Sequence, residues 1–204
     1  MDILESVPTS ARKISYEEFL ARCDDRNAAA WVDGEIIYMT VSVDHNDLSV
    51  WLNRIISTFL EYFILGKLFA DPFQMKTGPE LPGRAPDVCI LLNKNLRRLG
   101  RNHIEGPADL VIEVVNPESI GRDRGDKFVE YEQGGVSEYW IIDPLRKQAD
   151  FYLRGEDGYF HAVSADSRGI FRSTILEGLW IEVAWLWRSP LPPLVEVLKA
   201  WELI

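Results

Sequence analysis

Two carboxylates in apolar surroundings are the residues of this chain best suited to chemistry. Glu113 lies in the middle of the aliphatic run 110–115, and Asp87 lies at the start of a second apolar run, directly after Pro86. Alternate side chains of a strand face opposite sides, and a run that is apolar at both kinds of position is typical of a strand buried on both faces. Removing a carboxylate from water costs several kcal/mol unless it has a partner. We therefore expect Glu113 to face a metal ion, a cation or a water-filled cleft.

A pair of carboxylates on neighbouring strands would suit a hard divalent cation. The connection between Asp87 and Glu113 is long enough for their two strands to pair, which would bring both side chains to one place. Mg²⁺ typically binds one or two protein carboxylates and keeps several waters, and Mn²⁺ accepts the same ligands. Such an ion polarises a phosphate oxygen and activates water, and a nearby lysine would stabilise the charge that develops on the phosphate. The pair thus predicts metal-assisted phosphoryl chemistry.

The elements that would position these residues follow from the central stretch 108–143. Its pattern predicts a strand, a crossover helix and a second strand, and such a unit implies parallel strands with a right-handed crossover. On the helix, Asp123, Lys127 and Tyr131 recur at four-residue steps and so share one stripe. The three predicted elements are a strand at 110–115, a helix at about 123–133 and a strand at 138–142.

Other segments carry recognisable start, stop and turn signals. Ser15 and Glu18 form a capping box for a helix that runs to Arg22, and Asp33-Gly34 is a favoured hairpin turn. A long apolar stripe predicts a helix over 44–65, with Asp44 as its cap and Gly66 at its end. The remaining predictions are a hairpin at 31–39, strands at 68–75 (interrupted at Pro72), 84–92, 148–153 and 159–163, a loop or short helix at 93–106, and a last helix at 194–203.

Length and composition indicate an ordinary globular protein. The chain has 204 residues with 47% hydrophobic content, and no change of composition marks a second domain. We expect a single domain over 1–204, with a core at about 15–165 and a C-terminal extension at about 170–204. No apolar run approaches the ~20 residues of a membrane span and no signal peptide is recognisable, so the expected location is cytoplasmic and no membrane partner is expected. Cys23 and Cys89 are expected to be free thiols.

The net charge of −10 argues against a broad electrostatic grip on nucleic acid. A local basic patch around an acidic site remains compatible with it, and a solvated face explains the same residues equally well. The basic residues concerned are Lys94, Arg97, Arg98, Arg101, Arg122, Arg124 and Lys127.

The C-terminal segment is rich in aromatic residues, and Trp180, Trp185 and Trp187 stand close together. Stacking on nucleic-acid bases is one interpretation. Packing onto the main domain or a dimer contact is favoured over it. We expect a homodimer, because this aromatic segment offers a contact surface between two copies of the chain.

Several motifs resemble those of one family. Pro86-Asp87 followed by Glu113-Val114-Val115 resembles the PD-(D/E)xK nuclease motif, and the whole pattern resembles the Uma2 family of restriction-endonuclease-like proteins. The similarity covers roughly residues 15 to 185. It is carried by the turn at 31–35, His45, the runs 85–90, 109–119 and 122–127, Tyr131, and Gly135-Val-Ser-Glu-Tyr-Trp-Ile-Ile-Asp-Pro144.

The resemblance implies a fold and a set of roles. The fold would be an α/β (α+β) restriction-endonuclease-like core, a mixed central sheet flanked by helices, with an N-terminal hairpin and an aromatic C-terminal extension. The metal, Mg²⁺ or Mn²⁺, would be held by Asp87, Glu113 and the backbone carbonyl of Val114. Lys127 would act as the catalytic lysine, migrated to the helix, although a salt bridge to Asp123 on a solvated face is the plain alternative for it. Arg122, Asp123 and His45 would orient groups or bind phosphate, and for His45 a structural or surface role is favoured.

Two positions depart from the family pattern. The motif's usual lysine would be residue 115, where this chain has Val115. The family commonly has a Glu before the hairpin turn, where this chain has Ala30, and Glu35 lies across the turn and cannot replace it. If that Glu helps to hold the metal, its loss weakens the site.

Three functions are therefore weighed. The first is a divalent-metal-dependent endonuclease acting on DNA, and the second is a catalytically inactive interaction module that keeps the nuclease fold. A two-carboxylate glycosidase is set aside, because the site offers lysine and arginine in place of a sugar-stacking cleft.

Overall fold

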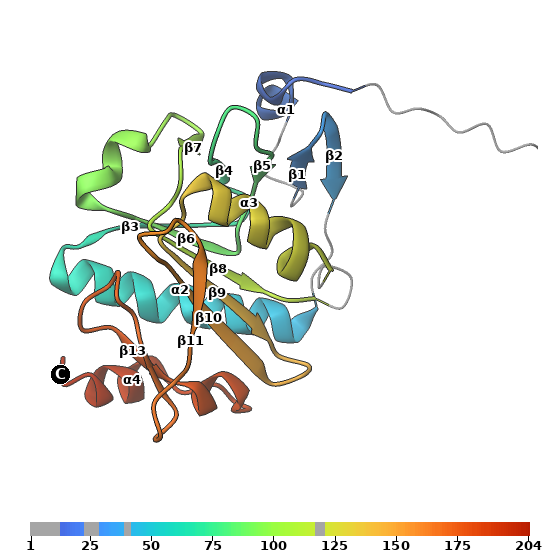
Figure 1. Cartoon of the computed structure of the whole chain (residues 1–204). Helices are drawn as coiled ribbons and strands as arrows, with labels where there is room; N and C mark the ends of the chain where they lie inside the picture. Colours follow the sequence, from blue (N-terminus) through green and yellow to red (C-terminus); the bar gives the residue numbers. More distant parts are fainter. Residues whose placement is uncertain (1–12, 23–28, 39–41, 117–120) are drawn as a thin grey trace, which may run out of the picture.

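A mixed sheet with helices on both faces forms the centre of the molecule (Figure 1). The computed structural model describes residues 13–22, 29–38, 42–116 and 121–204. Within these, the central sheet is six-stranded in the order β11-β10-β9-β8-β6-β3. Its strands are β3 (Gly66–Ala70), β6 (Val88–Leu92), β8 (Leu110–Val114), β9 (Glu138–Asp143), β10 (Gln148–Arg154) and β11 (Phe160–Val163).

The strand–helix–strand unit predicted from the central stretch is confirmed. β8 and β9 pair in parallel, with Glu113 opposite Ile141, while the other neighbours in this sheet pair antiparallel. The helix between them begins with a π-helical turn, η2 (Arg122–Asp126), and continues as α3 (Lys127–Gly134). It ends at Gly135, whose positive φ of 87° closes the helix in the left-handed conformation. The predicted mixed α/β (α+β) class is also confirmed.

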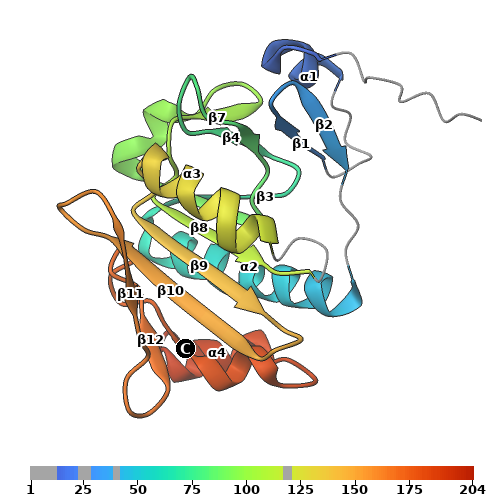
Figure 2. The same ribbon diagram turned by 45° about the vertical axis from the view of Figure 1, so that its right-hand side comes forward.

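The helix α2 (Val43–Phe63) lies along one face of the sheet and α3 along the other, as both views show (Figures 1 and 2). Even-numbered side chains of β6 and β8, such as Ile90 and Ile112, pack in the core with α2. Odd-numbered ones, such as Cys89 and Val111, pack in a second core beneath α3. Cys89 is a free, buried thiol, whereas Cys23 lies outside the described residues.

Both ends of α2 differ from the sequence prediction. Ser42, not Asp44, is the N-cap, and its Oγ accepts a hydrogen bond from the backbone N–H of His45 at 3.2 Å. Ile64, not Gly66, closes the helix in the left-handed conformation, and Gly66 is already the first residue of β3. In β3, a Cβ at position 66 would meet the carbonyl oxygen of Leu91 at 2.2 Å, so this glycine is required by the close approach of the next strand.

A second, smaller sheet lies beyond α3 and carries the N-terminal hairpin. Its order is β2-β1-β5-β4-β7, and the predicted turn at Asp33-Gly34 has positive φ at both residues. The predicted strand 68–75 is in fact two strands, because the chain passes from the large sheet to the small one at Pro72. The small sheet consists of β1 (Ala29–Val32), β2 (Glu35–Tyr38), β4 (Gln74–Lys76), β5 (Gly83–Arg84) and β7 (His103–Glu105), and the short helices nearby are α1 (Tyr16–Arg22) and η1 (Asn93–Arg98).

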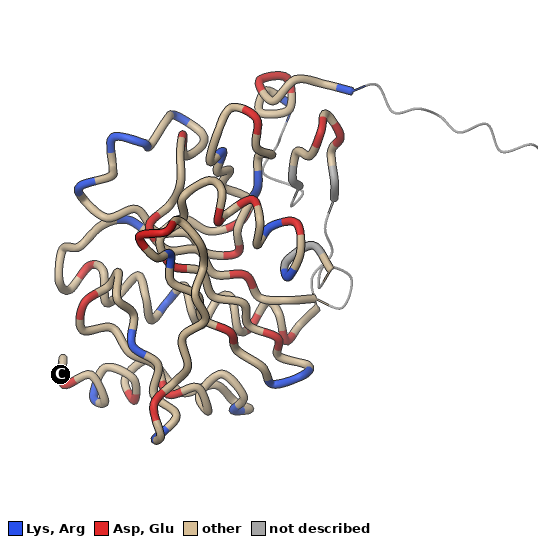
Figure 3. Tube along the Cα trace, viewed as in Figure 1, with Lys and Arg blue, Asp and Glu red and all other residues tan. Residues whose placement is uncertain are grey.

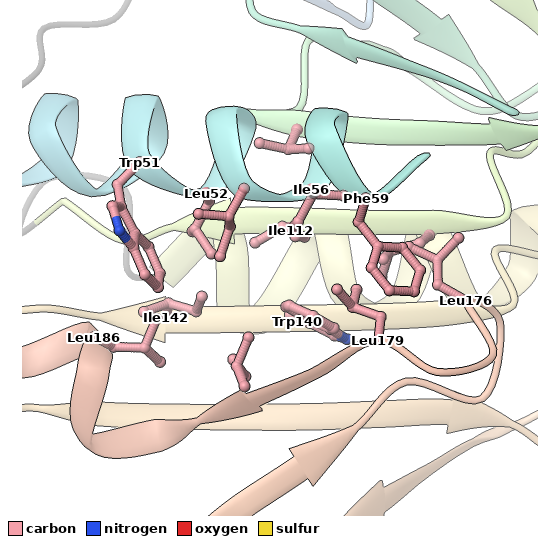
Figure 4. Packing of buried hydrophobic residues seen from close by; sticks show 14 of the residues in the cluster. Trp51, Leu52, Ile56, Phe59, Ile112, Trp140, Ile142, Leu176, Leu179 and Leu186 are labelled. Carbon is pink, nitrogen blue, oxygen red and sulfur yellow. The ribbon is translucent and has the colours of Figure 1, made fainter. Parts of the chain in front are cut away.

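The C-terminal extension packs against α2 and the central sheet. Trp51 donates a hydrogen bond from Nε1 to the carbonyl of Pro192, and Trp201 packs edge-on against Phe59 with ring centroids 5.4 Å apart. Figure 4 shows the tryptophan and leucine side chains of this core between α2 and the strands. The packing interpretation of the aromatic tail is therefore correct. The extension contains β12 (Ile170–Arg172), β13 (Trp180–Glu182), η3 (Val183–Trp187) and α4 (Leu194–Ala200).

Candidate active site

The pairing of β6 and β8 brings Asp87 and Glu113 to neighbouring backbone positions at one end of the two strands. Val88 pairs with Ile112 in the antiparallel ladder of β6 and β8, so the next residues outward, Asp87 and Glu113, also lie opposite one another. Their side chains contact different helices, because Asp87 meets His45 of α2 whereas Glu113 meets Lys127 of α3. Asp87 also holds the end of β8, because its Oδ2 accepts a hydrogen bond from the backbone N–H of Val114 at 2.6 Å.

Glu113 is buried and meets two side chains of α3. Its exposed fraction is 2%, and its Oε2 lies 2.8 Å from Nζ of Lys127, which is itself 5% exposed. Tyr131, one helical turn later, donates its hydroxyl hydrogen to Oε1 of Glu113 at 2.7 Å. The stripe of Lys127 and Tyr131 thus faces the carboxylate rather than solvent. The buried charge of Glu113 is balanced by an ammonium and a phenol from a single helix.

Tyr131 was not predicted as a site residue. Burial, and then the neighbouring charge of Glu113, raise the pKa of Tyr131 well above its ordinary value, so the phenol stays protonated and remains a donor. Next to it, Arg84 of β5 donates two hydrogen bonds of 2.7 Å to the carboxylate of Glu130. Burial by itself would lower the pKa of Arg84, but the bonds to Glu130 reverse this and raise it. This bidentate pair fixes α3 to the small sheet, and so fixes the stripe that faces Glu113.

His45 belongs to the site, although the sequence favoured a structural or surface role for it. It lies in the first turn of α2 with an exposed fraction of 6%. Its Nε2 is 3.2 Å from Oδ1 of Asp87. The cap at Ser42 sets the direction of this first turn, so the start of α2 is what brings the imidazole to the carboxylate.

A third carboxylate, Asp71, was missed by the sequence reading. Ala70 of β3 pairs with Val88 of β6, so Asp71 is the residue opposite Asp87. Asp71, Asp87 and Glu113 therefore form a row across three adjacent strands. Burial, and then the charge of Asp87, raise the pKa of Asp71 to about 6, while Lys127 and His45 oppose the shift. The available signal was an aspartate at the end of an apolar strand, at a point where Pro72 diverts the chain.

The donor set suits a hard cation, although the described residues contain no ready-made cluster. Within the described part of the chain, no three His, Cys, Asp or Glu side chains gather closely enough to hold a metal ion. The Oδ1 atom of Asp71 is shielded from solvent and has no hydrogen-bond partner among the described residues. Mg²⁺ needs only one or two protein carboxylates, and the pKa of Asp71 is raised first by burial and then by the charge of Asp87, which a cation would offset. The residues present therefore fit an oxygen-liganded divalent ion.

The remaining predicted residues are not all brought to the site. Arg122 and Asp123 have their backbone in η2, but their side chains lie outside what the structure describes. Arg124 pairs with Asp150 of β10 at 2.5 Å. The basic segment 94–101 follows the far end of β6 and so lies a whole strand away from Asp87, at the left edge of the view in Figure 3. The residues of the segment 94–101 therefore do not join a basic patch around the carboxylates.

Comparison with known proteins assigns a family to this arrangement. The sequence profile of Uma2, described as "Putative restriction endonuclease", matches residues 16–184. The chain belongs to the Uma2 family. No curated protein matches it.

A solved structure shares the fold of this Uma2 protein. It is titled a putative nuclease belonging to DUF820, from Anabaena variabilis ATCC 29413. The match has a TM-score of 0.67 at 16% identity and covers 85% of this chain and 97% of that one. Family and fold together indicate a restriction-endonuclease-like nuclease, a class that acts on nucleic acid and generally uses divalent metals. No helix in the described part of this Uma2 chain is long and apolar enough to cross a bilayer.

Proposed function

We propose that this Uma2 protein is a divalent-metal-dependent endonuclease that hydrolyses phosphodiester bonds of DNA. The observation that carries the proposal is the meeting of two carboxylates from separate strands with an amine from the following helix. Asp87 and Glu113 come next to the paired residues Val88 and Ile112 at one end of β6 and β8, and Nζ of Lys127 is 2.8 Å from Glu113. Carboxylates that can hold a metal ion and a lysine beside them suit metal-assisted phosphodiester hydrolysis, because the ion activates water and the cation stabilises the developing charge.

Each side chain has a role that follows from its contacts. Asp87, Glu113 and the backbone carbonyl of Val114 would hold Mg²⁺ or Mn²⁺. When bound, the ion would neutralise charge on a phosphate oxygen and lower the pKa of a water molecule. Lys127 carries a fixed positive charge beside Glu113 and would stabilise the phosphate as its negative charge grows. Tyr131 and His45 orient the two carboxylates through their contacts with Glu113 and Asp87.

An interaction module without activity is the second candidate. It is favoured by the contacts of Glu113, because both oxygens of this carboxylate already have partners in Lys127 and Tyr131. Ala30 and Val115 stand where the family pattern has a glutamate and a lysine. The net charge of −10 points the same way.

Nicking of supercoiled plasmid DNA in Mn²⁺ distinguishes the two candidates. We expect the wild type and Glu177→Gln, a control at an exposed glutamate, to nick the plasmid, and Glu113→Gln to lose at least 100-fold in rate. Cleavage by Glu113→Gln at the wild-type rate would remove the mechanism. Failure of the wild type on plasmid, linear and single-stranded DNA would favour the interaction module. Anomalous scattering from a crystal soaked in Mn²⁺ reports the ion directly, independent of activity.

We also propose a homodimer. The tryptophans of the tail are used in the fold, but Tyr62, Phe63 and Ile64 at the end of α2 remain exposed and offer an apolar contact. Sedimentation velocity at micromolar concentration should give a species of about 47 kDa, twice the 23.4 kDa of the chain. A monomer throughout the micromolar range would refute the dimer and leave the nuclease proposal intact.

A further inference from the structure

A polar cavity adjoins the carboxylate row on the side of α2. It has a volume of about 470 Å³ and is lined by one side of that helix and by the ends of β3 and β6. This volume is in the range of pockets that hold small molecules. Asp71 and Asp87 line its inner end, so the cavity opens directly onto the candidate metal ligands. A molecule that fills the cavity would lie next to the phosphate on which the proposed nuclease acts.

The walls of the cavity contain polar atoms that lack partners. Oγ of Ser49 and Oδ1 of Asp71 are both shielded from solvent, and neither has a hydrogen-bond partner among the described residues. Buried polar atoms are normally hydrogen-bonded. Ser49 and Asn53 lie one helical turn apart on the wall formed by α2. Asn53 thus places an amide on this wall for a ligand that can hydrogen-bond.

Charge divides the cavity into two ends. Arg54 lines the outer end, is exposed, and makes no ion pair with any described residue. His45 and Arg54 are nine residues apart on α2, which is about 13 Å along the helix axis. The inner end is acidic and suits a cation, whereas the outer end suits an anion. The cavity therefore suits a ligand with two negative groups, one at Arg54 and the other near the carboxylates.

We propose that this cavity takes one unpaired nucleotide beside the scissile phosphate, and that the substrate is therefore single-stranded DNA. The inference rests on the proposed nuclease function and specifies its substrate class. Arg54 would bind the neighbouring phosphate, while Asn53 would hydrogen-bond the sugar or base edge. A base inside a duplex cannot enter a pocket of this kind unless it leaves the stack, which costs a few kcal/mol that a single strand does not pay.

Two further observations support a single strand over a duplex. A neighbouring pocket of about 500 Å³ shares Asn53 and Ala70 with the cavity and continues along α2 beside the edge strand β3. It offers a path for the next nucleotide. Duplex binding draws on many phosphate contacts. Here Arg84, Arg124 and Lys127 are engaged in ion pairs, and the segment 94–101 lies at the other end of β6.

Fluorescence anisotropy with a labelled 12-nucleotide single strand tests the inference. Binding is measured in Ca²⁺ at several salt concentrations, with the integrity of the oligonucleotide checked afterwards. We expect Arg54→Ala to weaken binding about tenfold and to reduce the slope of log K against log salt by about 0.7, the value for one phosphate contact on a single strand. Asn53→Leu fills the cavity without changing charge, so it should weaken binding at an unchanged slope. Arg97→Ala, which removes an exposed arginine at the far end of β6, is the matched control and should bind like the wild type.

The outcomes separate the inference from the nuclease proposal. Equal affinity for the single strand and a blunt duplex of the same sequence would overturn the inference, as would equal binding by Arg54→Ala and Arg97→Ala or no binding at all. If the wild type and Arg54→Ala hydrolyse the single-stranded oligonucleotide equally well in Mn²⁺, the inference fails while the nuclease proposal stands. If Arg54-dependent single-strand binding is found but no DNA is hydrolysed in Mn²⁺, the binding site stands and the nuclease proposal fails.

Discussion

The pair of Lys127 and Glu113 is the residue-scale feature on which the site depends. Both side chains are almost fully buried, so each charge is stable there only because the other is present. The sequence singled out Glu113, because a glutamate within an aliphatic strand needs a partner, and the family resemblance singled out Lys127 as the migrated lysine. It did not predict Tyr131 or Asp71, because their roles depend on helix phase and on a strand pairing across a change of sheet.

Removing one member of this pair should destabilise the protein more than removing both. Lys127→Met leaves Glu113 buried without its counter-charge and should cost about 3–5 kcal/mol, and Glu113→Gln should cost a similar amount by stranding the ammonium. The double variant should lose clearly less than the sum of the two, because no isolated charge remains. Urea denaturation at pH 7 in EDTA measures the three free energies of unfolding. Additive losses would show that the two side chains do not interact.

Asp71 should make stability fall between about pH 4 and pH 6. Its pKa is raised from 3.8 to about 6, so the folded state holds its proton more tightly than the unfolded state. For such an acid the contribution to stability is complete below the unfolded pKa and is lost as the pH rises through the folded one. Asp71→Asn should therefore be more stable than the wild type by about 1 kcal/mol at pH 7, after allowance for partial exposure, and should show no gain at pH 4.

Chemical denaturation of wild type and Asp71→Asn at pH 4, 5, 6 and 7 checks this prediction. The matched control is Asp44→Asn, which replaces an exposed aspartate in the first turn of α2. A constant difference between Asp71→Asn and the wild type at all four values would contradict the titration.

At the scale of elements, α2 joins the core to the site. Its apolar stripe fixes the helix on the sheet, and its first turn carries His45 to Asp87. The stripe was readable from sequence because it spans five turns. The ends were not, since Ser42 and Asp44 are both favourable caps and only the backbone geometry decides between them. The left-handed closure at Ile64 was likewise unpredictable, because a glycine stands two residues later.

Loss of the Ser42 cap should destabilise α2. Ser42→Ala removes the acceptor for the backbone N–H of His45 and should cost about 1 kcal/mol, or roughly 2–4 °C in the melting temperature of a protein of this size. Ser42→Asp keeps an acceptor at the same position and should melt close to the wild type. Thermal melts followed by circular dichroism measure both. An equal loss in the two variants would mean that the cap does not contribute through this hydrogen bond.

At the scale of the whole molecule, the C-terminal extension is tied to the central sheet by a buried carboxylate. Glu138 opens β9 with no exposed surface, and it lies opposite Leu110 at the end of β8 farthest from Val114. Its Oε2 accepts hydrogen bonds from the loop after β12, and its Oε1 accepts one from Trp140 at 2.7 Å. The donors in the loop are Ser173 Oγ, Thr174 N and Oγ1, and Ile175 N. The sequence marked Glu138 only as the start of a strand, since its partners in the loop after β12 lie 35 residues and more along the chain.

This arrangement predicts that a substitution at Glu138 lowers the stability of the protein without changing metal binding at the candidate site. Glu138→Gln replaces a carboxylate oxygen with an amide that must face donors, and leaving one of these buried groups unsatisfied should cost about 1–3 kcal/mol. The site should be unaffected, because Glu138 lies on the α2 face of the sheet whereas Glu113 faces α3. Urea denaturation should therefore show a lower midpoint for Glu138→Gln, while Mn²⁺ binding by the folded protein matches both the wild type and the exposed control Glu156→Gln. A normal midpoint would mean that the loop after β12 is held by its apolar contacts alone, and weakened Mn²⁺ binding would mean that the two faces of the sheet are coupled.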